Sequence, residues 1–399
     1  MRICHVITRL IVGGAQENTV LSCVGLHERG HEVTLVTGPE TGPEGSLMAQ
    51  AREHGFAIEV VPELRRAVRP LGDLKALQAL TRLLTLLRPD VVHTHSSKAG
   101  IVGRLAARRA KVPIIVHTVH GMSFNRTQSP LSRALYRRLE RRCARFTDRL
   151  VCVADAMAAQ TAAARVAPAS KCTTIYSGIR TEWFAPERWD RDEVRRHWNF
   201  ADDAIVVGTV ARLFPNKGYE QLIPAAARAA RREPRLRFVW VGDGGRRAAY
   251  ERQLAALGLR DRVHLTGLVA PDQVARLLAG MDFVVHASQW EGLPRIAVQA
   301  LLMERPVVSF AIDGAPEVVI PGETGLLVPL NDVAGLADAI DALAGNPQRR
   351  TAMGRAGRQR CLRQFDYRVM IDALEQLYNE LAEQRVSHRS AESVLSEGV

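Results

Sequence analysis

Residues 204–218 read AIVVGTVARLFPNKG, and this stretch decides the fold. An apolar run rich in Val and Ile ends just before Arg212, and a turn that contains Pro215 and Gly218 leads into a helical pattern. A short buried strand, a tight turn and a helix in this order are typical of a βα unit in a parallel sheet. The stretch therefore predicts an α/β fold.

The same alternation continues along the chain on both sides of this unit. Further strands are predicted at residues 237–241, 263–265, 283–286, 306–310 and 326–328, and, in the first half, at 2–8, 32–37, 57–61, 90–94, 114–118 and 150–153. Helical patterns cover residues 15–28, 72–87, 98–109 and 131–147. Two such series predict two Rossmann-like, doubly wound domains.

The βα rhythm is interrupted at residues 175–203, and we place the linker near 178–190. The predicted domains are residues 1–182 and 183–365. A final amphipathic helix is expected at 366–384, because Met370, Leu374, Leu377 and Leu381 share one face. The polar segment 385–399 is expected to be a flexible tail.

The composition limits the class of protein. The 399 residues are 47% hydrophobic and 24% charged, which excludes a disordered, collagen-like or coiled-coil chain. The 6 cysteines form no C-x-x-C pair, so no metal site is predicted. The chain lacks a recognisable signal peptide and a long apolar run, so a cytoplasmic location is expected.

The net charge of +12 indicates an anionic partner. Residues 104–149 hold twelve Lys and Arg residues against two acidic ones, so this segment carries +10 of the +12. In the predicted helix 131–147, we expect Leu131, Leu135 and Leu139 to pack on the sheet while the arginines face outward. An arginine-rich solvated face is the simpler explanation of the charge.

Two cations flank the turn after residue 210. Arg212 follows a strand and Lys217 precedes a helix, which is where open α/β sheets bind ligands. Converging on a diphosphate, such cations could replace a divalent metal, because each contact contributes about 4 kcal/mol at about 4 Å and an effective dielectric constant of about 20. Either residue alone would more simply be a solvated surface charge.

The segment after the strand 283–286 reads SQWEGLPRIAVQA and opens another helix. Pro294 suits the first helical turn, where its missing amide would be unpaired anyway. The amides of Leu293, Arg295 and Ile296 could face a phosphate, and Glu291 could accept hydrogen bonds from sugar hydroxyls. The simpler interpretation of Glu291 is an N-terminal helix cap.

Three further turns are weaker signals. Gly13 and Gly14 lie between the first strand and its helix, and Gly242 follows another strand, so both turns could bring amides close to an anion. His120 stands beside a glycine at the end of a strand, where it could donate to a sugar oxygen. His95 and His117 are more simply buried structural residues.

Taken in order, these segments resemble the family 4 retaining glycosyltransferases of the GT-B fold. The shared features are G-G near the start, H-G after the fifth strand, R-x4-K-G, V-G-D-G and E-G-x-P, and they span residues 2–381. The resemblance implies two Rossmann-like domains that face a cleft, with the acceptor on the first domain and the nucleotide sugar on the second. It also implies a last helix that crosses back to the first domain.

The resemblance assigns a role to each matching residue. Arg212 and Lys217 look like the pair that neutralises the diphosphate, and Gly14 like an amide contact to the same phosphates. Glu291 and His120 look like the residues that contact the transferred sugar, and Leu268 belongs to a loop like the one beside the base. Gln299 stands where the family usually has a second glutamate for the ribose, and glutamine keeps an acceptor oxygen but loses the charge.

The implied activity is sugar transfer from a nucleoside diphosphate sugar to a glycan or lipid-linked acceptor, with retention and without a metal or cofactor. The nearest alternative is a sugar-nucleotide epimerase of the same fold. A basic nucleic-acid-binding protein is disfavoured, because the arginine-rich segment lacks interleaved aromatic residues. We instead expect docking at the inner face of an anionic membrane through Arg133, Arg137, Arg138, Arg141, Arg142 and Arg145.

Overall fold

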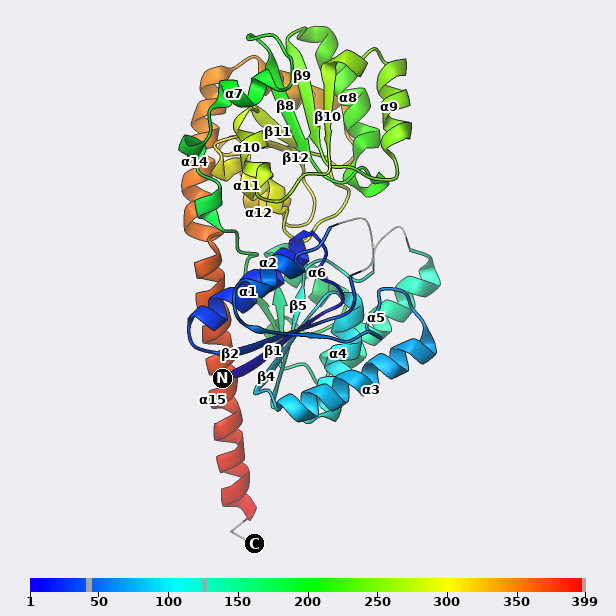
Figure 1. Ribbon diagram of the computed structural model, residues 1–399, viewed down its shortest axis with the longest axis vertical. Helices are drawn as coiled ribbons and strands as arrows, with labels where there is room; N and C mark the ends of the chain where they lie inside the picture. Colours follow the sequence, from blue (N-terminus) through cyan, green and yellow to red (C-terminus); the bar gives the residue numbers. More distant parts are fainter. Residues whose placement is uncertain (41–44, 125–127, 397–399) are drawn as a thin grey trace. The chain divides into compact units, whose positions relative to one another are not determined.

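The computed structural model describes residues 1–40, 45–124 and 128–396, and side chains up to residue 387. The chain forms two compact units (Figure 1). Unit 1 contains Met1–Gly178 and the chain from Tyr367 onward, and unit 2 contains Ile179–Asp366. The division falls between Gly178 and Ile179, whereas the sequence led us to place it between residues 182 and 183.

Unit 1 is built on a parallel sheet with the strand order β3-β2-β1-β4-β5-β6-β7. The strands are β1 (Arg2–Ile7), β2 (Glu32–Thr37), β3 (Ala57–Val60), β4 (Val91–His95), β5 (Ile114–Val119), β6 (Arg149–Cys152) and β7 (Cys172–Thr174). The chain starts in the middle and winds outward on both sides. This places the carboxyl ends of β1, β4 and β5 next to one another.

Helices cover both faces of this sheet. On one face α3 (Pro70–Leu87) packs on α4 (Ser97–Arg109), and α4 also contacts α5 (Pro130–Ala144). On the other face α1 (Gly14–Glu28) packs against α15 (Tyr367–Ser396). Alternate residues of β1 enter the two cores, with Ile3 in one and Cys4 in the other. The unit is completed by α2 (Met48–Arg52) and α6 (Asp155–Ala163).

Unit 2 repeats the plan with a parallel sheet in the order β10-β9-β8-β11-β12-β13. The strands are β8 (Ile205–Val210), β9 (Leu236–Val241), β10 (Val263–Gly267), β11 (Phe283–His286), β12 (Val307–Phe310) and β13 (Gly325–Val328). Its helices are α7 (Arg191–Arg196), α8 (Tyr219–Arg232), α9 (Arg247–Ala256), α10 (Gln273–Ala279), α11 (Arg295–Leu302), α12 (Ala315–Val318), α13 (Val333–Ala344) and α14 (Pro347–Gln364). The predicted pair of doubly wound α/β sheets is confirmed.

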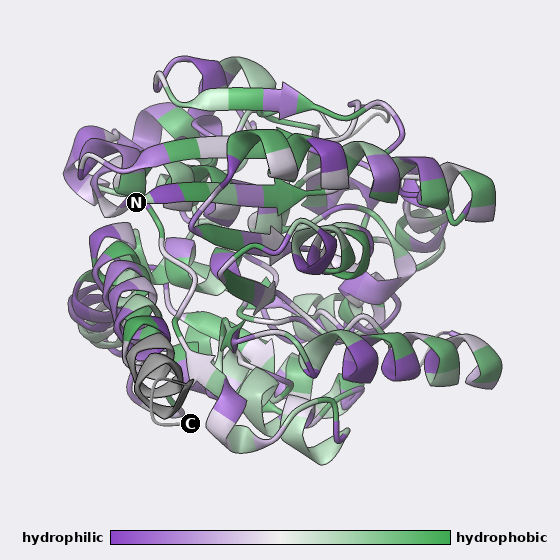
Figure 2. Cartoon of the chain, turned by 90° about the horizontal axis from the view of Figure 1, so that it is seen from below, coloured by the Kyte–Doolittle hydropathy of each residue, from purple (hydrophilic) through white to green (hydrophobic). Residues whose placement is uncertain are grey.

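Most strand residues of both units are buried, and the strands in Figure 2 carry green, apolar segments beside purple, hydrophilic ones. Every strand predicted from the sequence is present, with ends that shift by a residue or two. The strand that the sequence did not predict is β7, because Cys172–Thr174 is only 3 residues long and half-buried at the sheet edge. Such a segment carries neither a long apolar run nor an alternating pattern.

Helix α15 continues to Ser396, where we expected a flexible tail from residue 385. The segment Tyr367–Ser396 contains no glycine and no proline, and Ala, Leu, Glu and Arg within it favour helix, so nothing in the sequence stops the helix at residue 384. Its apolar face, with Met370, Leu374, Leu377 and Leu381, is buried in unit 1 as the spacing predicted. The return of the last helix to the first unit is thus part of the fold.

Helix α5 corrects one prediction. Leu131 and Leu135 do not pack on the sheet, because they are 81% and 55% exposed. The helix ends at Ala144, and its buried residues are Glu140, Cys143 and Ala144 near that end. The beginning of α5 therefore projects both leucines and arginines into solvent. Within the described residues, no helix is long and apolar enough to span a bilayer.

Candidate active site

The turn after β8 is shaped by Gly218. This residue has φ +76°, and a Cβ on it would lie 1.7 Å from the carbonyl oxygen of Ala287, just beyond β11. A side chain is thus excluded both by backbone conformation and by the neighbouring chain. The close approach places Lys217, one residue earlier, against the loop that follows β11.

Lys217 and Glu291 meet at the carboxyl edge of the unit 2 sheet. The Lys217 Nζ atom donates to Glu291 Oε1 at 2.5 Å, and His286 Nε2 lies 3.4 Å from the same oxygen. His286 is buried and its Nδ1 pairs with Ser309 Oγ at 3.3 Å. Two residues predicted from separate motifs are therefore in direct contact, and His286 joins them.

The charge of Glu291 is secured by this environment. Burial raises the pKa of the carboxyl, but the charge of Lys217 and the hydrogen bond and charge of His286 outweigh it, so the pKa is held well below its usual range. Glu291 is an ionised acceptor at neutral pH. An ionised carboxylate of this kind can accept hydrogen bonds from sugar hydroxyls.

The backbone around Glu291 is held on the far side by Asp313. The Glu291 amide donates to Asp313 Oδ2 at 2.7 Å, and the Gly314 amide donates to the carbonyl oxygen of Gly292 at 3.1 Å. Asp313 itself adopts φ +43°. These bonds fix the loop that carries Glu291 before the next helix begins.

Helix α11 begins at Arg295, so Pro294 is its N-cap rather than its first helical residue. Leu293 is buried, whereas Arg295, Ile296 and Gln299 are half-buried. The first amides of a helix have no intrahelical acceptor and carry the positive end of its dipole. The structure thus places the predicted phosphate-facing amides at a helix start that directly follows Glu291.

Arg212 stands in the same loop as Lys217, five residues earlier. Its side chain is exposed, and the guanidinium stacks over Phe214 with 5.0 Å from Cζ to the ring centroid. The loop is supported from below by the V-G-D-G turn, because Leu213 N donates to Asp243 O at 3.0 Å. The diphosphate role of Arg212 stays a prediction.

Gly242 supports the same loop by close packing. A Cβ on this residue would lie 2.3 Å from the carbonyl oxygen of Ala211, and its amide already donates to Gly267 O at 3.0 Å. The glycine is therefore required by the backbone contact, and its donor-binding role stays a prediction. Leu268 follows this bridge and is 55% exposed, and its role beside the base stays a prediction.

In unit 1, Gly14 is the first residue of α1 and is exposed. Glu17 N donates to Gly13 O at 2.9 Å, which starts the helical ladder. The contact of Gly14 with the diphosphate stays a prediction.

His120 lies just beyond β5 and belongs to a row of histidines. Its Nε2 lies 3.1 Å from His95 Nδ1, and His95 Nε2 lies 2.9 Å from His5 Nδ1. His93 is buried beside them and bonds Thr118 Oγ1 at 2.6 Å. His5, His93 and His95 come from the adjacent strands β1 and β4, where His5 pairs in register with His93.

The buried imidazoles of His5, His93 and His95 are kept neutral. Burial lowers the pKa of His5 to about 3. Burial, followed by repulsion from the neighbouring imidazoles, lowers the pKa values of His93 and His95 well below the usual value. One nitrogen of each of His5, His93 and His95 lies within 4.8 Å of the others, so the three rings are close enough together to hold a metal ion. The prediction of no metal stays a prediction.

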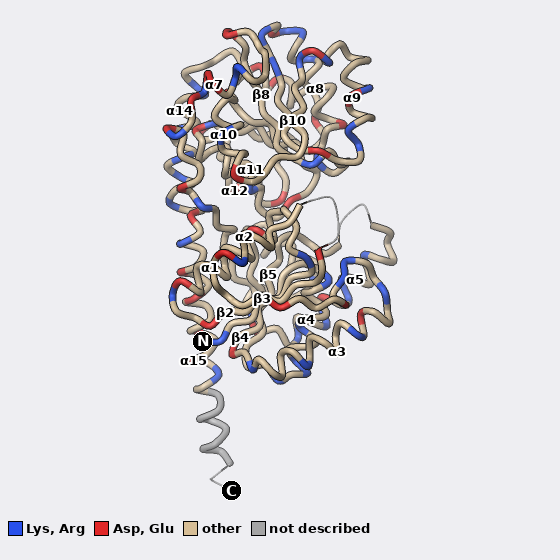
Figure 3. The backbone as a smooth tube through the Cα atoms, in the orientation of Figure 1, with Lys and Arg blue, Asp and Glu red and all other residues tan. Residues whose placement is uncertain are grey.

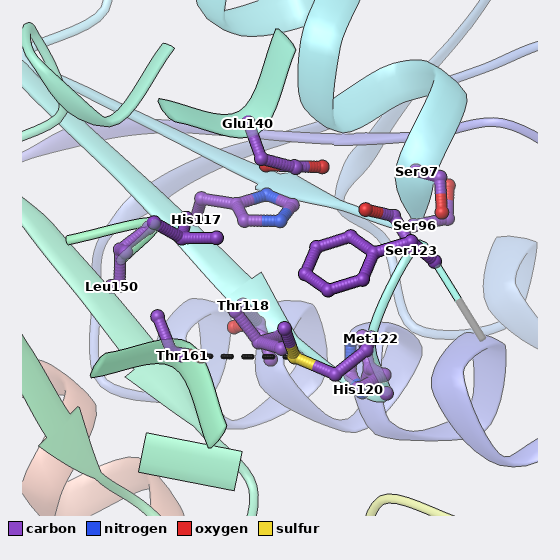
Figure 4. Close-up of a pocket in the computed structure, with 14 residues that line it drawn as sticks. Ser96, Ser97, His117, Thr118, His120, Met122, Ser123, Glu140, Leu150 and Thr161 are labelled. Carbon is purple, nitrogen blue, oxygen red and sulfur yellow. Dashed lines mark hydrogen bonds between the residues drawn. The ribbon is translucent and has the colours of Figure 1, made fainter. Parts of the chain in front are cut away.

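His117 points to the opposite face of the sheet and lines a pocket of about 60 Å³ together with His120, Ser96 and Glu140 (Figure 4). Arg104 Nη2 donates to Glu140 Oε2 at 2.5 Å, and His117 Nδ1 bonds Thr94 Oγ1 at 2.9 Å. The volume is that of a few water molecules, so a sugar ring does not fit inside it. His117 is a structural residue here, in line with the simpler interpretation.

Sequence reasoning missed His286, Asp313 and the link from His95 to His120. His286 and Asp313 each lie near the carboxyl end of a strand of unit 2, which is the available signal. For the histidine row the signal is the V-H-T-H segment 92–95, because alternate residues of a strand share one face. Contacts between segments far apart in the chain have no local signature.

Family models match both halves of the chain. Residues 13–178 match the model described as "Glycosyl transferase 4-like domain", and residues 190–360 match "Glycosyl transferases group 1". These matches fall within unit 1 and unit 2, respectively.

Relatives and solved structures extend over most of the chain. It is 28% identical over 385 residues to the Escherichia coli "UDP-Gal:alpha-D-GlcNAc-diphosphoundecaprenol alpha-1,3-galactosyltransferase", with 96% of this chain and 97% of that protein covered. It is 30% identical over 365 residues to the "D-inositol 3-phosphate glycosyltransferase" of Actinosynnema mirum, with 86% of each covered. The structure of Anabaena HepE in complex with UDP and glucose superposes with a TM-score of 0.83 at 23% identity, covering 95% of this chain and 100% of that one.

Proposed function

The chain belongs to the family 4-like glycosyltransferases of the GT-B fold, and from that premise we propose how its own residues carry out sugar transfer. It moves a sugar from a nucleotide sugar to a glycan or lipid-linked acceptor. The observation that carries the residue assignment is the Lys217–Glu291–His286 cluster at the carboxyl edge of the unit 2 sheet.

Unit 2 binds the nucleoside diphosphate sugar. Lys217 and Arg212 neutralise the diphosphate, and the start of α11 adds amides and the positive end of a helix dipole. Glu291 accepts hydrogen bonds from the sugar hydroxyls, and Gln299 replaces the usual ribose-binding carboxylate with a neutral acceptor. No metal or cofactor has an assigned task in this scheme.

The proposed reaction keeps the anomeric configuration. The bond from the anomeric carbon to the leaving diphosphate breaks, the acceptor oxygen attacks the same face, and the acceptor proton passes to the departing phosphate oxygen. Lys217 stabilises the charge that grows on the leaving group, which is the part of the reaction where electrostatic stabilisation counts most. His120 donates a hydrogen bond to the transferred sugar.

The relative from Escherichia coli is named for UDP-galactose, and the Anabaena structure contains UDP. We therefore propose a uridine diphosphate sugar as donor and a lipid diphosphate-linked sugar as acceptor. A ligand that binds only the native state raises the melting temperature by mass action. Thermal shifts should then be larger with UDP than with GDP or ADP, and among UDP-galactose, UDP-glucose and UDP-N-acetylglucosamine one donor should dominate.

The best donor is next incubated with N-acetylglucosamine-diphosphoundecaprenol as the acceptor. NMR of the product should give the same anomeric configuration as the donor, and an inverted product would refute retention. Donor alone should be hydrolysed only slowly. Epimerised sugar nucleotide in that control would instead support an epimerase, and no nucleotide shift at all would contradict the donor site.

We also propose that unit 1 docks peripherally on the anionic cytoplasmic face of a membrane, where a lipid-linked acceptor lies. Basic residues follow α4 and α5 (Figure 3), and Arg133, Arg137 and Arg138 are exposed beside Leu131 and Leu135. Arginines can contact the anionic headgroups of a membrane, while exposed leucines beside them can enter the apolar region beneath the headgroups. Arg141 is less available, since its Nη2 donates to Ala164 O at 2.7 Å.

The segment that leads into α3 and the first turn of that helix add a second exposed apolar group. Val68 and Leu71 are 67% and 79% exposed and are interleaved with the exposed Arg65, Arg66 and Arg69. Each basic residue near an anionic surface contributes about 1 kcal/mol. Two exposed clusters in unit 1 that combine arginines with apolar residues support a docking surface more than a single cluster would.

Vesicle co-sedimentation tests the docking. The protein should pellet with phosphatidylglycerol-containing vesicles at low salt and remain in solution with phosphatidylcholine alone. Leu131→Ser with Leu135→Ser should weaken binding, and so should Arg137→Glu with Arg138→Glu. The matched control is Arg252→Glu with Arg260→Glu, which makes the same charge change at exposed sites of unit 2. An equal loss of vesicle binding in both charge-reversal variants would show that binding depends on net charge and not on this surface.

A further inference from the structure

His120 is the half-buried end of a chain of three imidazoles. The chain runs from His120 Nε2 to His95 Nδ1 over 3.1 Å, and from His95 Nε2 to His5 Nδ1 over 2.9 Å. His95 and His5 are 1% and 0% exposed, and His95 and His120 lie on the adjacent strands β4 and just past β5. Each ring in this chain contacts the next through one nitrogen.

Neutral rings restrict the possible arrangements of protons. A neutral imidazole carries one N–H and one acceptor nitrogen, so each hydrogen bond between two rings needs one donor and one acceptor. Burial keeps His5 and His95 uncharged at neutral pH by lowering their pKa values. Only two arrangements then satisfy both bonds, and they differ in direction.

The inner end of the chain distinguishes the two directions. His5 Nε2 is buried and has no hydrogen-bond partner among the described residues. If the protons pointed inward, this atom would be a buried N–H without an acceptor, and orphaned buried N–H groups are rarer than under-satisfied acceptors. If the protons point outward, His5 Nε2 is an acceptor without a donor, which costs less. The outward direction is favoured.

We propose that His5 and His95 form a buried relay that holds His120 as its Nδ1–H tautomer. His5 Nδ1–H donates to His95 Nε2, and His95 Nδ1–H donates to His120 Nε2. The hydrogen bond on one ring nitrogen sets which tautomer the ring adopts. His5 and His95 are thus positioning residues, and the inference rests on the proposed role of His120 in sugar contact.

The relay limits what His120 can do in the reaction. Its Nε2 lone pair is occupied by His95, so His120 acts as a neutral hydrogen-bond donor through Nδ1–H. It does not remove the acceptor proton through Nε2. This agrees with a reaction in which the departing phosphate oxygen takes that proton.

A metal cluster is the competing use of these histidines. His5, His93 and His95 are close enough together to hold an ion. However, both nitrogens of His93 are already bonded, Nε2 to Thr118 Oγ1 at 2.6 Å and Nδ1 to the Tyr378 hydroxyl at 2.5 Å. The 2.9 Å separation of His5 Nδ1 and His95 Nε2 fits a shared proton. The geometry therefore favours the relay.

The first test needs no substrate. Long-range ¹H–¹⁵N correlation spectra of the full chain, labelled with ¹⁵N-histidine at neutral pH, report the tautomer of each ring. Assignments come from His5→Asn, His95→Asn and His120→Asn. All three rings should show protonated Nδ1. Protonated Nε2 on His95 or His120, or one equivalent of tightly bound zinc by elemental analysis, would overturn the relay.

The second test separates positioning from packing. His95→Asn places an amide nitrogen near the position of Nδ1, whereas His95→Gln places it near the position of Nε2. The glutamine variant should lose about 10-fold to 100-fold in kcat with little change in donor KM, because loss of an orienting partner typically costs that much. The asparagine variant should recover most of this loss. Turnover is followed as UDP release from the UDP-sugar selected by thermal shift.

His93→Gln is the matched control. It removes an equally buried imidazole whose two nitrogens are bonded to Thr118 and Tyr378, so that His93 donates no hydrogen bond to the relay. It should lower the melting temperature but keep kcat within a few-fold. If kcat in the three variants simply followed the melting temperature, the relay would be structural only. Failure of the wild type to release UDP from any donor would reject the proposed function, while the spectra would still decide the tautomer.

Discussion

At the scale of single residues, the Lys217–Glu291 contact is the feature that joins two sequence motifs. Each motif could be read from the sequence as strand, turn and helix, and their residue types indicated phosphate and sugar binding. The 2.5 Å contact between Lys217 and Glu291 could not be predicted from the sequence. It depends on the close approach of Gly218, after β8, to Ala287, after β11. Asp313 was missed for the same reason, since it supports Glu291 from a third loop.

Substitution of the pair tests the proposed donor site. Lys217→Ala should lower kcat/KM by about 10²-fold to 10³-fold, as removal of one preorganised donor to a charged transition state does. Glu291→Ala should lose most activity as well, because the sugar loses an ionised acceptor. Gln299→Glu should retain transferase activity, with a change in donor KM. The measurement is initial rate against donor concentration, and near-normal turnover in either alanine variant would count against this site.

At the scale of secondary-structure elements, the histidines of β1, β4 and β5 couple the stability of unit 1 to pH. Burial lowers the pKa values of His5, His93, His95 and His117. The unfolded chain takes up these protons below about pH 6.5, whereas the folded chain resists them, down to about 3 for His5. Stability therefore rises with pH across this window and falls on acidification.

The expected size of the effect is measurable. Each such histidine contributes about 1.4 kcal/mol per pH unit once the unfolded form is protonated. Urea unfolding at several pH values between about 7 and 5 should give a free energy of unfolding that falls steeply as pH decreases. His117→Gln should reduce the slope by about one proton, and a flat profile in the wild type would show that the histidines ionise freely in the folded chain.

In unit 2 a buried ion cluster ties α7 to the sheet. Asp282 accepts from Arg191 at 2.7 Å, from Arg195 at 2.6 Å and from Val206 N at 2.7 Å. Burial raises the pKa of Asp282, but Arg191 and Arg195 outweigh this and hold it below the usual value. The carboxylate thus completes the contact of α7 with the starts of β8 and β11.

Asp282→Asn should lower the free energy of unfolding by about 3–5 kcal/mol, because it leaves Arg195 without its buried counter-charge. The control is Asp338→Asn, which breaks the exposed pair with Arg232 and should cost about 0–1 kcal/mol. Both are measured by urea unfolding. Similar small losses in the two variants would mean that water reaches Asp282 in place of the arginines.

Element boundaries were predictable where the pattern was long and regular. The strands of both sheets follow from apolar runs bounded by turns, and α15 follows from one apolar face. Helix α5 was placed correctly, but its burial was not, because spacing alone does not reveal that Leu131 and Leu135 at its start are exposed. Periodicity identifies the face of a helix and leaves open how much of its length is covered.

At the scale of the whole molecule, unit 1 depends on the last helix of the chain. Tyr367, Met370, Ile371, Leu374 and Tyr378 belong to the same core as residues of β1 and α1. Gly25 permits the contact, since a Cβ on it would lie 2.5 Å from Ile371 Cγ1. Spacing alone predicted an amphipathic last helix. Its return to the first domain was predicted only from the resemblance to a known family.

Removal of residues 367–399 should therefore expose one apolar face of the unit 1 sheet. The truncated chain is expected to aggregate or to lose the unfolding transition of unit 1, because the apolar residues of β1 and α1 that share a core with α15 would be exposed to water. Removal of residues 388–399 alone is the control and should leave solubility intact. Soluble yield and urea unfolding are the measurements, and a stable soluble chain after the longer truncation would contradict the assignment of α15 to this core.

The position of α15 also sets the order in which a growing polypeptide can finish each unit. Unit 1 begins at Met1 but needs Tyr367 and the residues after it, whereas Ile179–Asp366 contains all of unit 2. Chains emerge from the ribosome from the N-terminus, at about 5–20 residues per second. Unit 2 can thus complete its core during translation, while β1 to β7, which are made earlier, wait for α15 to complete the core on one face of their sheet.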